Sequence, residues 1–279
     1  MKQMSNPALK KKNDFLWCWL IILPAVLLGA LAMAAADVSP FLWGMQLAAW
    51  AVLPLPVLLL RRMAGCIPVA VWVVVLVAAL AASLLGEPVE GARRWLDLGF
   101  LTVNAAMLLL PALLMLAYRV RIPHPIILLS ALVLCFQPDL SQLAAFVLAV
   151  LPLLWMHRKQ RLWMMAGVVS FLILAVWCLL TPVSMEPVSY SEEILALLGE
   201  VFKPLQAVGW LALAAIPAFF AYSFVRHRSK WMLSLAIYYA VCILFGLTGE
   251  YPTLFMGYGL SPIVGMGLAW LCCDGERVS

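Results

Sequence analysis

The sequence has few charged residues and no long polar segment. Only 11% of its 279 residues are charged, whereas 66% are hydrophobic and the mean hydropathy is +1.05. Soluble domains contain about a quarter charged residues and about half apolar ones. No polar stretch is long enough to form a core of its own, which excludes a separate soluble domain. We therefore predict one integral membrane domain over residues 1–279, with an N-terminal tail at 1–14.

Motifs for metal ions, phosphates and nucleophilic catalysis are also absent. The seven cysteines have no C-x-x-C spacing, and each of the three histidines lies beside Arg or Lys at the end of an apolar run. No Gly-rich phosphate loop, Ser/His/Asp set or H-E-x-x-H occurs. We predict no metal site and no cofactor, although dependence on a divalent cation cannot be read from the sequence. The basic residues form short groups rather than one patch, so no nucleic-acid partner is predicted.

Apolar runs that could cross a membrane make up most of the chain. A hydrocarbon core of about 30 Å needs about 20 helical residues. The first run, Phe15 to Ala36, is longer than a cleaved signal, so we interpret it as an uncleaved anchor despite the signal-peptidase-like Ala34-Ala35-Ala36. The further runs lie at about 40–60, 66–85, 98–118, 125–137, 140–156, 162–181, 194–225, 231–249 and 252–273.

The basic residues favour ten spans with both termini in the cytoplasm. The fifth and sixth runs are short and could instead form one helix broken at Gln137-Pro138-Asp139. Ten spans leave all Lys and Arg residues on the inner side except Arg93, Arg94 and Lys203, as expected for cytoplasmic loops. We therefore predict an all-α, polytopic bundle of about ten transmembrane helices with cytoplasmic termini, in which the fifth and sixth runs form a hairpin.

The same topology places most acidic residues on the outer side. Acids contribute little to insertion, so this bias reflects either function or ordinary solvation of loops. The most polar outer loops are Gly86 to Asp97 and Thr181 to Lys203. The spans contain almost no ionisable residue, which argues against an ion-coupled transporter.

Four outer motifs resemble, in order, those of the SEDS family, the FtsW/RodA/SpoVE group. Gly91-Ala-Arg93-Arg94-Trp95-Leu-Asp97-Leu-Gly99 is similar to G-x-R-R-W-I-x-L-G, and Gln137-Pro138-Asp139-Leu140-Ser141 is similar to Q-P-D-L-G. Residues 191–200, S-E-E-I-L-A-L-L-G-E, resemble T-D-F-I-F-A-V-I-G-E, and residues 257–261, G-Y-G-L-S, resemble S-Y-G-G-S. Ten spans with cytoplasmic termini are also the architecture of that family.

The resemblance implies a role in bacterial cell-wall synthesis. Members polymerise lipid II, the undecaprenyl-pyrophosphate-linked disaccharide-peptide, into glycan strands, usually with a class B penicillin-binding protein. For this chain it implies a multi-pass protein of the bacterial inner (cytoplasmic) membrane, a peptidoglycan glycosyltransferase that acts in cell elongation, division or sporulation. The alternatives are a catalytically degenerate scaffold or lipid-binding partner of a penicillin-binding protein and, more weakly, a lipid translocator.

The family's catalytic Asp falls on Glu192, which the resemblance assigns as general base. By itself this residue is equally an exposed acid near a helix start, which suits the helix dipole. The predicted substrate-binding residues are Arg93, Arg94, Trp95, Gln137, Asp139, Glu200, Tyr258 and Ser261. From chemistry alone, the two arginines and Trp95 could grip phosphate or belong to an interfacial loop.

Two of these residues also have simpler structural interpretations. Asp139 is expected to cap the sixth span, and Glu200 is expected to pair with Lys203 on one helix.

The chain departs from the family in two places. The family's Q-P-S-E-x-x-K has become Asn104-Ala-Ala-Met107, with Leu110 in the Lys position, so a buried ion pair is replaced by apolar side chains. The outer loop before Glu192, long in the family, is here only Thr181 to Tyr190. Both departures favour the scaffold alternative, whereas the retained carboxylate favours the enzyme.

Overall fold

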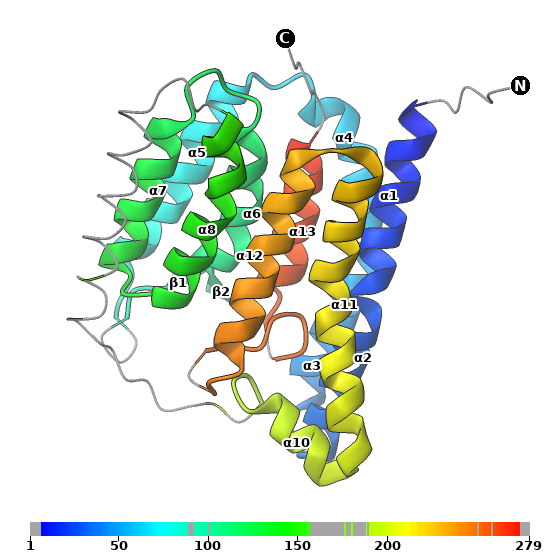
Figure 1. Cartoon of the computed structure of the whole chain (residues 1–279). Helices are drawn as coiled ribbons and strands as arrows, with labels where there is room; N and C mark the ends of the chain where they lie inside the picture. The colour runs from blue at the N-terminus through cyan, green and yellow to red at the C-terminus, as the bar shows by residue number, and fades with distance from the viewer. Residues whose placement is uncertain are drawn as a thin grey trace, which may run out of the picture.

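The computed structural model describes residues 7–88, 92–99, 101–156, 188, 190–249, 251–257 and 259–273, with the single positions 176 and 180. In these ranges the chain forms a helical bundle and one β-hairpin (Figure 1). The helices are α1 (Pro7–Ile21), α2 (Leu23–Ala35), α3 (Pro40–Val52), α4 (Pro54–Ala64), α5 (Val69–Ala82), the 3-10 helix η1 (Ser83–Leu85), α6 (Ala105–Ala117), α7 (His124–Phe136), α8 (Leu140–Met156), α10 (Ile194–Val201), α11 (Lys203–His227), α12 (Lys230–Gly246) and α13 (Ser261–Cys272). The strands are β1 (Trp95–Asp97) and β2 (Thr102–Asn104).

The predicted polytopic helical bundle is confirmed. Three helical stretches are long and apolar enough to cross a membrane, namely Asp14–Ala35, Pro40–Arg61 and Lys203–His227, and shorter apolar helices pack beside them. The beginning of α1 and the end of α13 lie at one end of the bundle, and the β-hairpin and α10 lie at the other (Figure 1). We refer to the latter as the outer end, because the positive-inside rule assigns Arg61 and Arg119, at the opposite end, to the cytoplasm.

The fifth and sixth runs form the predicted hairpin rather than one broken helix. Helices α7 and α8 are separate and pack against each other, and the turn Gln137–Asp139 joins them. The run at 162–181 falls largely outside the described residues. Helix α1 begins at Pro7, so residues 7–14 of the tail predicted at 1–14 are helical.

Two predicted spans begin later than expected because backbone turns interrupt apolar sequence. The run at 98–118 starts as a hairpin, in which Gly99 adopts φ +84° and its N–H donates to Asp97 Oδ1 over 2.7 Å. Strand β1 pairs antiparallel with β2, with Trp95 opposite Asn104, and α6 begins only at Ala105. The run at 252–273 starts as a buried loop, and α13 begins at Ser261.

A third run, at 194–225, divides into α10 and α11. Phe202 is extended, with φ −163° and ψ 113°, and separates the two helices. Pro204 follows in the first turn of α11, where a missing amide hydrogen is tolerated. For the same reason, Pro204 could not donate the next hydrogen bond of α10, so α10 cannot continue through it.

Helix α6 lies in the core of the bundle. Every residue from Ala105 to Ala117 is buried except Leu108. Leu110, at the position of the family's Lys, is fully buried. A Cβ atom on Gly265 of α13 would collide with the Met107 carbonyl, so the two helices touch through backbone. Exposed apolar side chains such as Leu59, Val74 and Leu211 cover the outside, as in a protein surrounded by lipid.

Candidate functional site at the outer end

Arg94 and Asp139 form a buried ion pair that joins the β-hairpin to the α7–α8 turn. Arg94 Nε lies 3.7 Å from Asp139 Oδ2, and Arg94 Nη2 donates to the Pro138 carbonyl over 2.7 Å. The Arg94 guanidinium also lies 5.8 Å from the centre of the Tyr251 ring, within cation–π range. Relative exposures of 6% and 2% leave little of either charged residue in contact with solvent. Three segments distant in sequence thus meet at one guanidinium.

Asp139 caps α8, as predicted. Its Oδ1 accepts the Gln142 amide hydrogen over 3.1 Å and the Ser141 hydroxyl over 2.7 Å. One carboxylate oxygen therefore satisfies the helix start while the other faces Arg94. Both functions are structural, and together they hold the α7–α8 turn against the hairpin.

Gln137 and Arg93 each bind the end of the third span. Gln137 is fully buried, and its Nε2 donates to Ser83 Oγ over 2.6 Å. Arg93 Nη1 donates to the Leu84 carbonyl over 2.8 Å, but its side chain is exposed. Of the two arginines predicted to bind substrate, Arg93 presents its charge to solvent and Arg94 is enclosed by protein.

Glu192 lies in the turn before α10, half-buried, with its side chain folded back on the chain. Its Oε2 accepts the Val188 amide hydrogen over 2.9 Å. Partial burial raises the pKa of Glu192 above its ordinary value of 4.5, although the Val188 hydrogen bond and the charge of Arg94 act in the opposite direction. A carboxylate with a raised pKa and a cation nearby is a common arrangement for a general base.

The loop Pro252–Gly257 packs directly on the Glu192 turn. Thr253 donates its amide hydrogen to the Ser191 carbonyl over 3.0 Å, and its hydroxyl donates to the Glu192 carbonyl over 3.4 Å. Gly257 leaves no room for a Cβ atom, which would collide with the Ser191 carbonyl. Thr253 was not predicted as a site residue, because its role depends on contacts with backbone more than 60 positions away.

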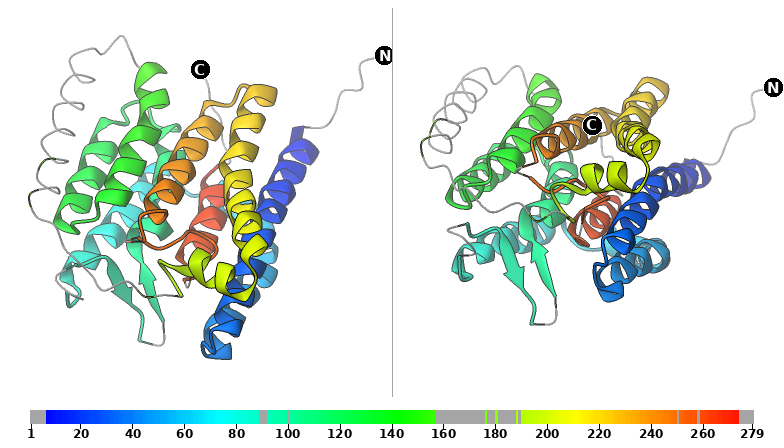
Figure 2. Two further views of the ribbon diagram at one scale, coloured as in Figure 1. Left: turned by 60° about the horizontal axis from the view of Figure 1, so that its bottom comes forward. Right: turned by 90° about the horizontal axis from the view of Figure 1, so that it is seen from below.

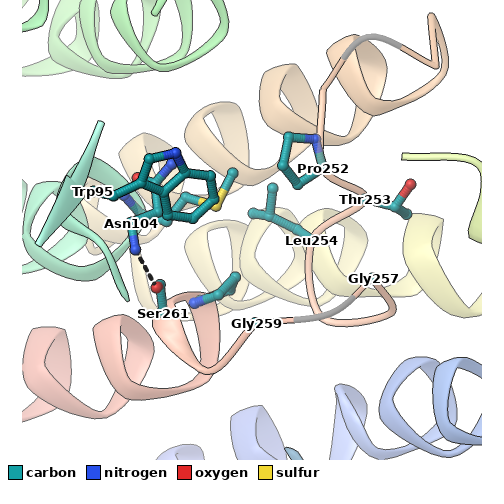
Figure 3. A pocket seen from close by; sticks show the side chains of 10 residues that line it. Trp95, Asn104, Pro252, Thr253, Leu254, Gly257, Gly259 and Ser261 are labelled. Carbon is teal, nitrogen blue, oxygen red and sulfur yellow. Dashed lines mark hydrogen bonds between the residues drawn. The ribbon is translucent and has the colours of Figure 1, made fainter. Parts of the chain in front are cut away.

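A shallow pocket opens between the hairpin and this loop (Figure 3). Its cavity volume is ≈ 20 Å³, which has room for about one water molecule and is far below the volume of small-molecule sites, which span about 300–1,000 Å³. It is lined by Trp95, Asn104, Met107, Pro252, Thr253, Leu254, Gly257, Gly259, Ser261 and Pro262. Ser261 Oγ accepts the Asn104 amide hydrogen over 2.8 Å, and Asn104 Oδ1 caps α6 by accepting the Met107 amide hydrogen, so these polar groups fix the pocket wall.

The remaining predicted residues are less closely connected. Glu200 is exposed on α10 and Lys203 is exposed at the start of α11; Phe202 interrupts the helix between them, and no ion pair joins them. The predicted pairing of Glu200 with Lys203 is therefore wrong. Tyr258 lies outside the described residues. Within the described part of the chain, His, Cys, Asp and Glu form no cluster of three suited to a metal ion.

Structural comparisons identify the fold. A crystal structure of the rod shape determining protein RodA from Thermus thermophilus matches with a TM-score of 0.66 and 19% sequence identity, over 94% of this chain and 97% of RodA. The chain has the RodA-like SEDS fold. A point mutant of the same RodA matches equally well, over 98% of its chain. A chain from a peptidoglycan synthase complex that coordinates polymerization and crosslinking matches this SEDS fold with a TM-score of 0.61 and 18% identity, over 94% of this chain and 98% of that chain.

The match is one of structure. No family model matches the sequence, and no curated protein does either. The resemblance of the four motifs to the SEDS family is thus supported by the fold of nearly the whole chain. Figure 2 shows the outer end of the bundle, where the β-hairpin and α10 lie. The Arg94–Asp139 ion pair joins the hairpin to the α7–α8 turn, and the charge of Arg94 acts on Glu192.

Proposed function

We propose that this protein is a SEDS-type peptidoglycan glycosyltransferase of the bacterial inner membrane that polymerises lipid II. The observation that carries the proposal is the half-buried Glu192 carboxylate, with a raised pKa and near Arg94, at the outer end of a RodA-like fold. Lipid-linked substrate would arrive through the exposed apolar faces of the helices.

Glu192 acts as the general base in this proposal. It takes the proton from the acceptor sugar hydroxyl, whose oxygen forms the new bond to the donor's anomeric carbon. The bond from that carbon to the pyrophosphate breaks, and undecaprenyl pyrophosphate leaves. A raised pKa suits Glu192 to this step, since a base with a pKa nearer to neutral both accepts the proton and remains ionised enough to react.

The two arginines have different roles. The exposed guanidinium of Arg93 is available to the leaving pyrophosphate, to which arginine can bind through two parallel hydrogen bonds. Arg94 is already bound to Pro138 and Asp139, so it positions the site and favours the ionised form of Glu192. Trp95, Gln137, Asp139, Glu200, Tyr258 and Ser261 stay predicted substrate-binding residues.

The scaffold alternative is favoured by one observation. Leu110 and its neighbours fill the core where the family has a charged pair, which leaves apolar packing at that position. The match to a chain of a peptidoglycan synthase complex supports a class B penicillin-binding protein as partner under either function.

Polymerisation assays separate the two functions. Purified protein, alone and with its cognate penicillin-binding protein, is given labelled lipid II, and glycan products are resolved by gel electrophoresis. We expect polymer from the wild type and none from Glu192→Ala or Glu192→Gln. Polymer from Glu192→Ala would show that Glu192 is not the general base. Absence of polymer from every form, with retained binding of the partner, would establish the scaffold instead.

A further inference from the structure

Helix α3 buries a single side chain, and that side chain is an amide. Of its thirteen residues, Gln46 has a relative exposure of 0%, whereas the others are half-buried or exposed. A buried amide is unfavourable in an apolar environment unless both of its polar atoms are bonded. Gln46 Oε1 has no hydrogen-bond partner, so packing alone would be served better by an apolar residue.

The other atom of this amide holds the backbone of Phe255. Gln46 Nε2 donates to the Phe255 carbonyl over 2.8 Å, and both groups are buried. Phe255 adopts φ +62°, a left-handed conformation that is strained for a residue with a bulky side chain. Such a conformation persists only where the surroundings impose it. The Gln46 hydrogen bond is one such restraint, and contact of the Phe255 ring with Tyr239 is another.

The restraint on Phe255 continues to Glu192 through the loop Pro252–Gly257. Gly257 donates its amide hydrogen to the Thr253 carbonyl over 2.8 Å, closing the loop around Phe255. Thr253 in turn binds the carbonyls of Ser191 and Glu192. A change at Phe255 therefore reaches the Glu192 turn through two consecutive sets of hydrogen bonds.

We propose that Gln46 is a positioning residue, which holds the loop Pro252–Gly257 and thereby fixes the turn that carries Glu192. That Gln46 restrains the turn is independent of the proposed function; that this restraint affects catalysis rests on it. Gln46 itself does not line the pocket, so its effect on the reaction passes through the loop. It also connects the site to α3, a helix whose remaining residues are half-buried or exposed.

Hydrogen exchange of the full-length protein in detergent tests the restraint without substrate. Gln46→Met keeps the length of the side chain and removes the donor. In this variant we expect about ten-fold faster exchange of peptides that contain the amides of Ser191, Glu192, Thr253 and Gly257, as for loss of one buried hydrogen bond. Exchange in α8 and α12 should stay as in the wild type. Unchanged exchange at these four amides in folded Gln46→Met would overturn the proposal.

Trp50 provides a matched control on the next turn of α3. Trp50 Nε1 donates to the Trp19 carbonyl over 3.0 Å, so it binds α3 to α1 and makes no contact of this kind with the loop. Trp50→Phe removes a comparable hydrogen bond. We expect it to leave exchange at the Glu192 turn unchanged. Equal acceleration in Trp50→Phe and Gln46→Met would show a general loosening of α3 and would contradict the proposal.

Lipid II polymerisation tests the catalytic consequence. In Gln46→Met we expect kcat to fall about ten-fold, in step with exchange at the Glu192 turn, while Trp50→Phe keeps the wild-type rate. Faster exchange with an unchanged kcat would overturn the positioning role. If the wild type forms no glycan, the proposed function fails, while hydrogen exchange still decides whether Gln46 restrains the turn.

Discussion

At the scale of single residues, Glu192 is subject to opposing influences. Partial burial favours its protonated form, whereas the Val188 amide and the Arg94 guanidinium favour the carboxylate; burial is the largest influence, so the pKa rises above 4.5. Because its pKa is raised in the folded state, Glu192 binds its proton more tightly in the folded protein than in the unfolded chain. The contribution of Glu192 to stability is therefore present below its ordinary pKa of 4.5 and is lost as pH rises through the folded pKa.

This balance predicts a pH dependence that Arg94 controls. The rate of glycan formation by the wild type should rise with pH through the raised pKa of Glu192, because the base must be ionised. Arg94→Met removes a nearby positive charge, so we expect the pKa of Glu192, and with it the acidic limb of the rate profile, to move to higher pH. Measured rate profiles check this; a limb that moves to lower pH in Arg94→Met would contradict it.

Asp139 predicts a difference between two substitutions that both remove its charge. Asp139→Ala removes the α8 cap and leaves Arg94 buried without its partner, so unfolding should be easier by about 3–5 kcal/mol. Asp139→Asn keeps an oxygen for the cap, and we expect a smaller loss. Thermal unfolding in detergent measures both. If Asn is as damaging as Ala, the cap contributes little and the charge dominates.

At the scale of elements, apolar runs predicted most helices but not the loops that position the site. Residues 252–260 begin the apolar run at 252–273, yet Gly257 and the left-handed Phe255 bend the chain into a loop whose polar groups bind Gln46 and Ser191. Hydropathy cannot distinguish a buried apolar loop from a helix end. Gln46 and Asn104 were missed as contributors to the site because their partners lie far away in sequence: Gln46 donates to the Phe255 carbonyl, and the backbone N–H of Asn104 donates to the Ser261 hydroxyl.

The contact between α6 and α13 depends on glycine. A Cβ atom on Gly265 would collide with the Met107 carbonyl, which is backbone and cannot turn aside. Gly265→Ala should therefore separate the two helices and destabilise the fold by about 1–3 kcal/mol. Gly44, on α3, has no atom within 4 Å of the corresponding position, and Gly44→Ala is the control expected to be neutral or slightly stabilising. Thermal unfolding of both variants checks this; similar effects would contradict the close contact.

At the scale of the whole molecule, the charge pattern requires the α6–α7 connection and the β-hairpin to lie at opposite ends of the bundle. The positive-inside rule places the α6–α7 connection in the cytoplasm and the β-hairpin outside, and the structure puts these segments at opposite ends of the bundle (Figure 1). Glu192, Arg94 and Asp139 then lie at the outer end. Polymerisation of a substrate on the outer face requires this orientation, so an error in topology would remove the proposed function.

Cysteine labelling in intact cells tests the orientation. Asp97→Cys and Arg121→Cys introduce exposed thiols at the two ends, in a Cys66→Ser background because Cys66 is itself exposed. We expect a membrane-impermeant maleimide to label Asp97→Cys in intact cells and Arg121→Cys only after permeabilisation. The reverse pattern would place Glu192 in the cytoplasm. The proposed base would then lie on the opposite side of the membrane from a growing wall, whatever its geometry.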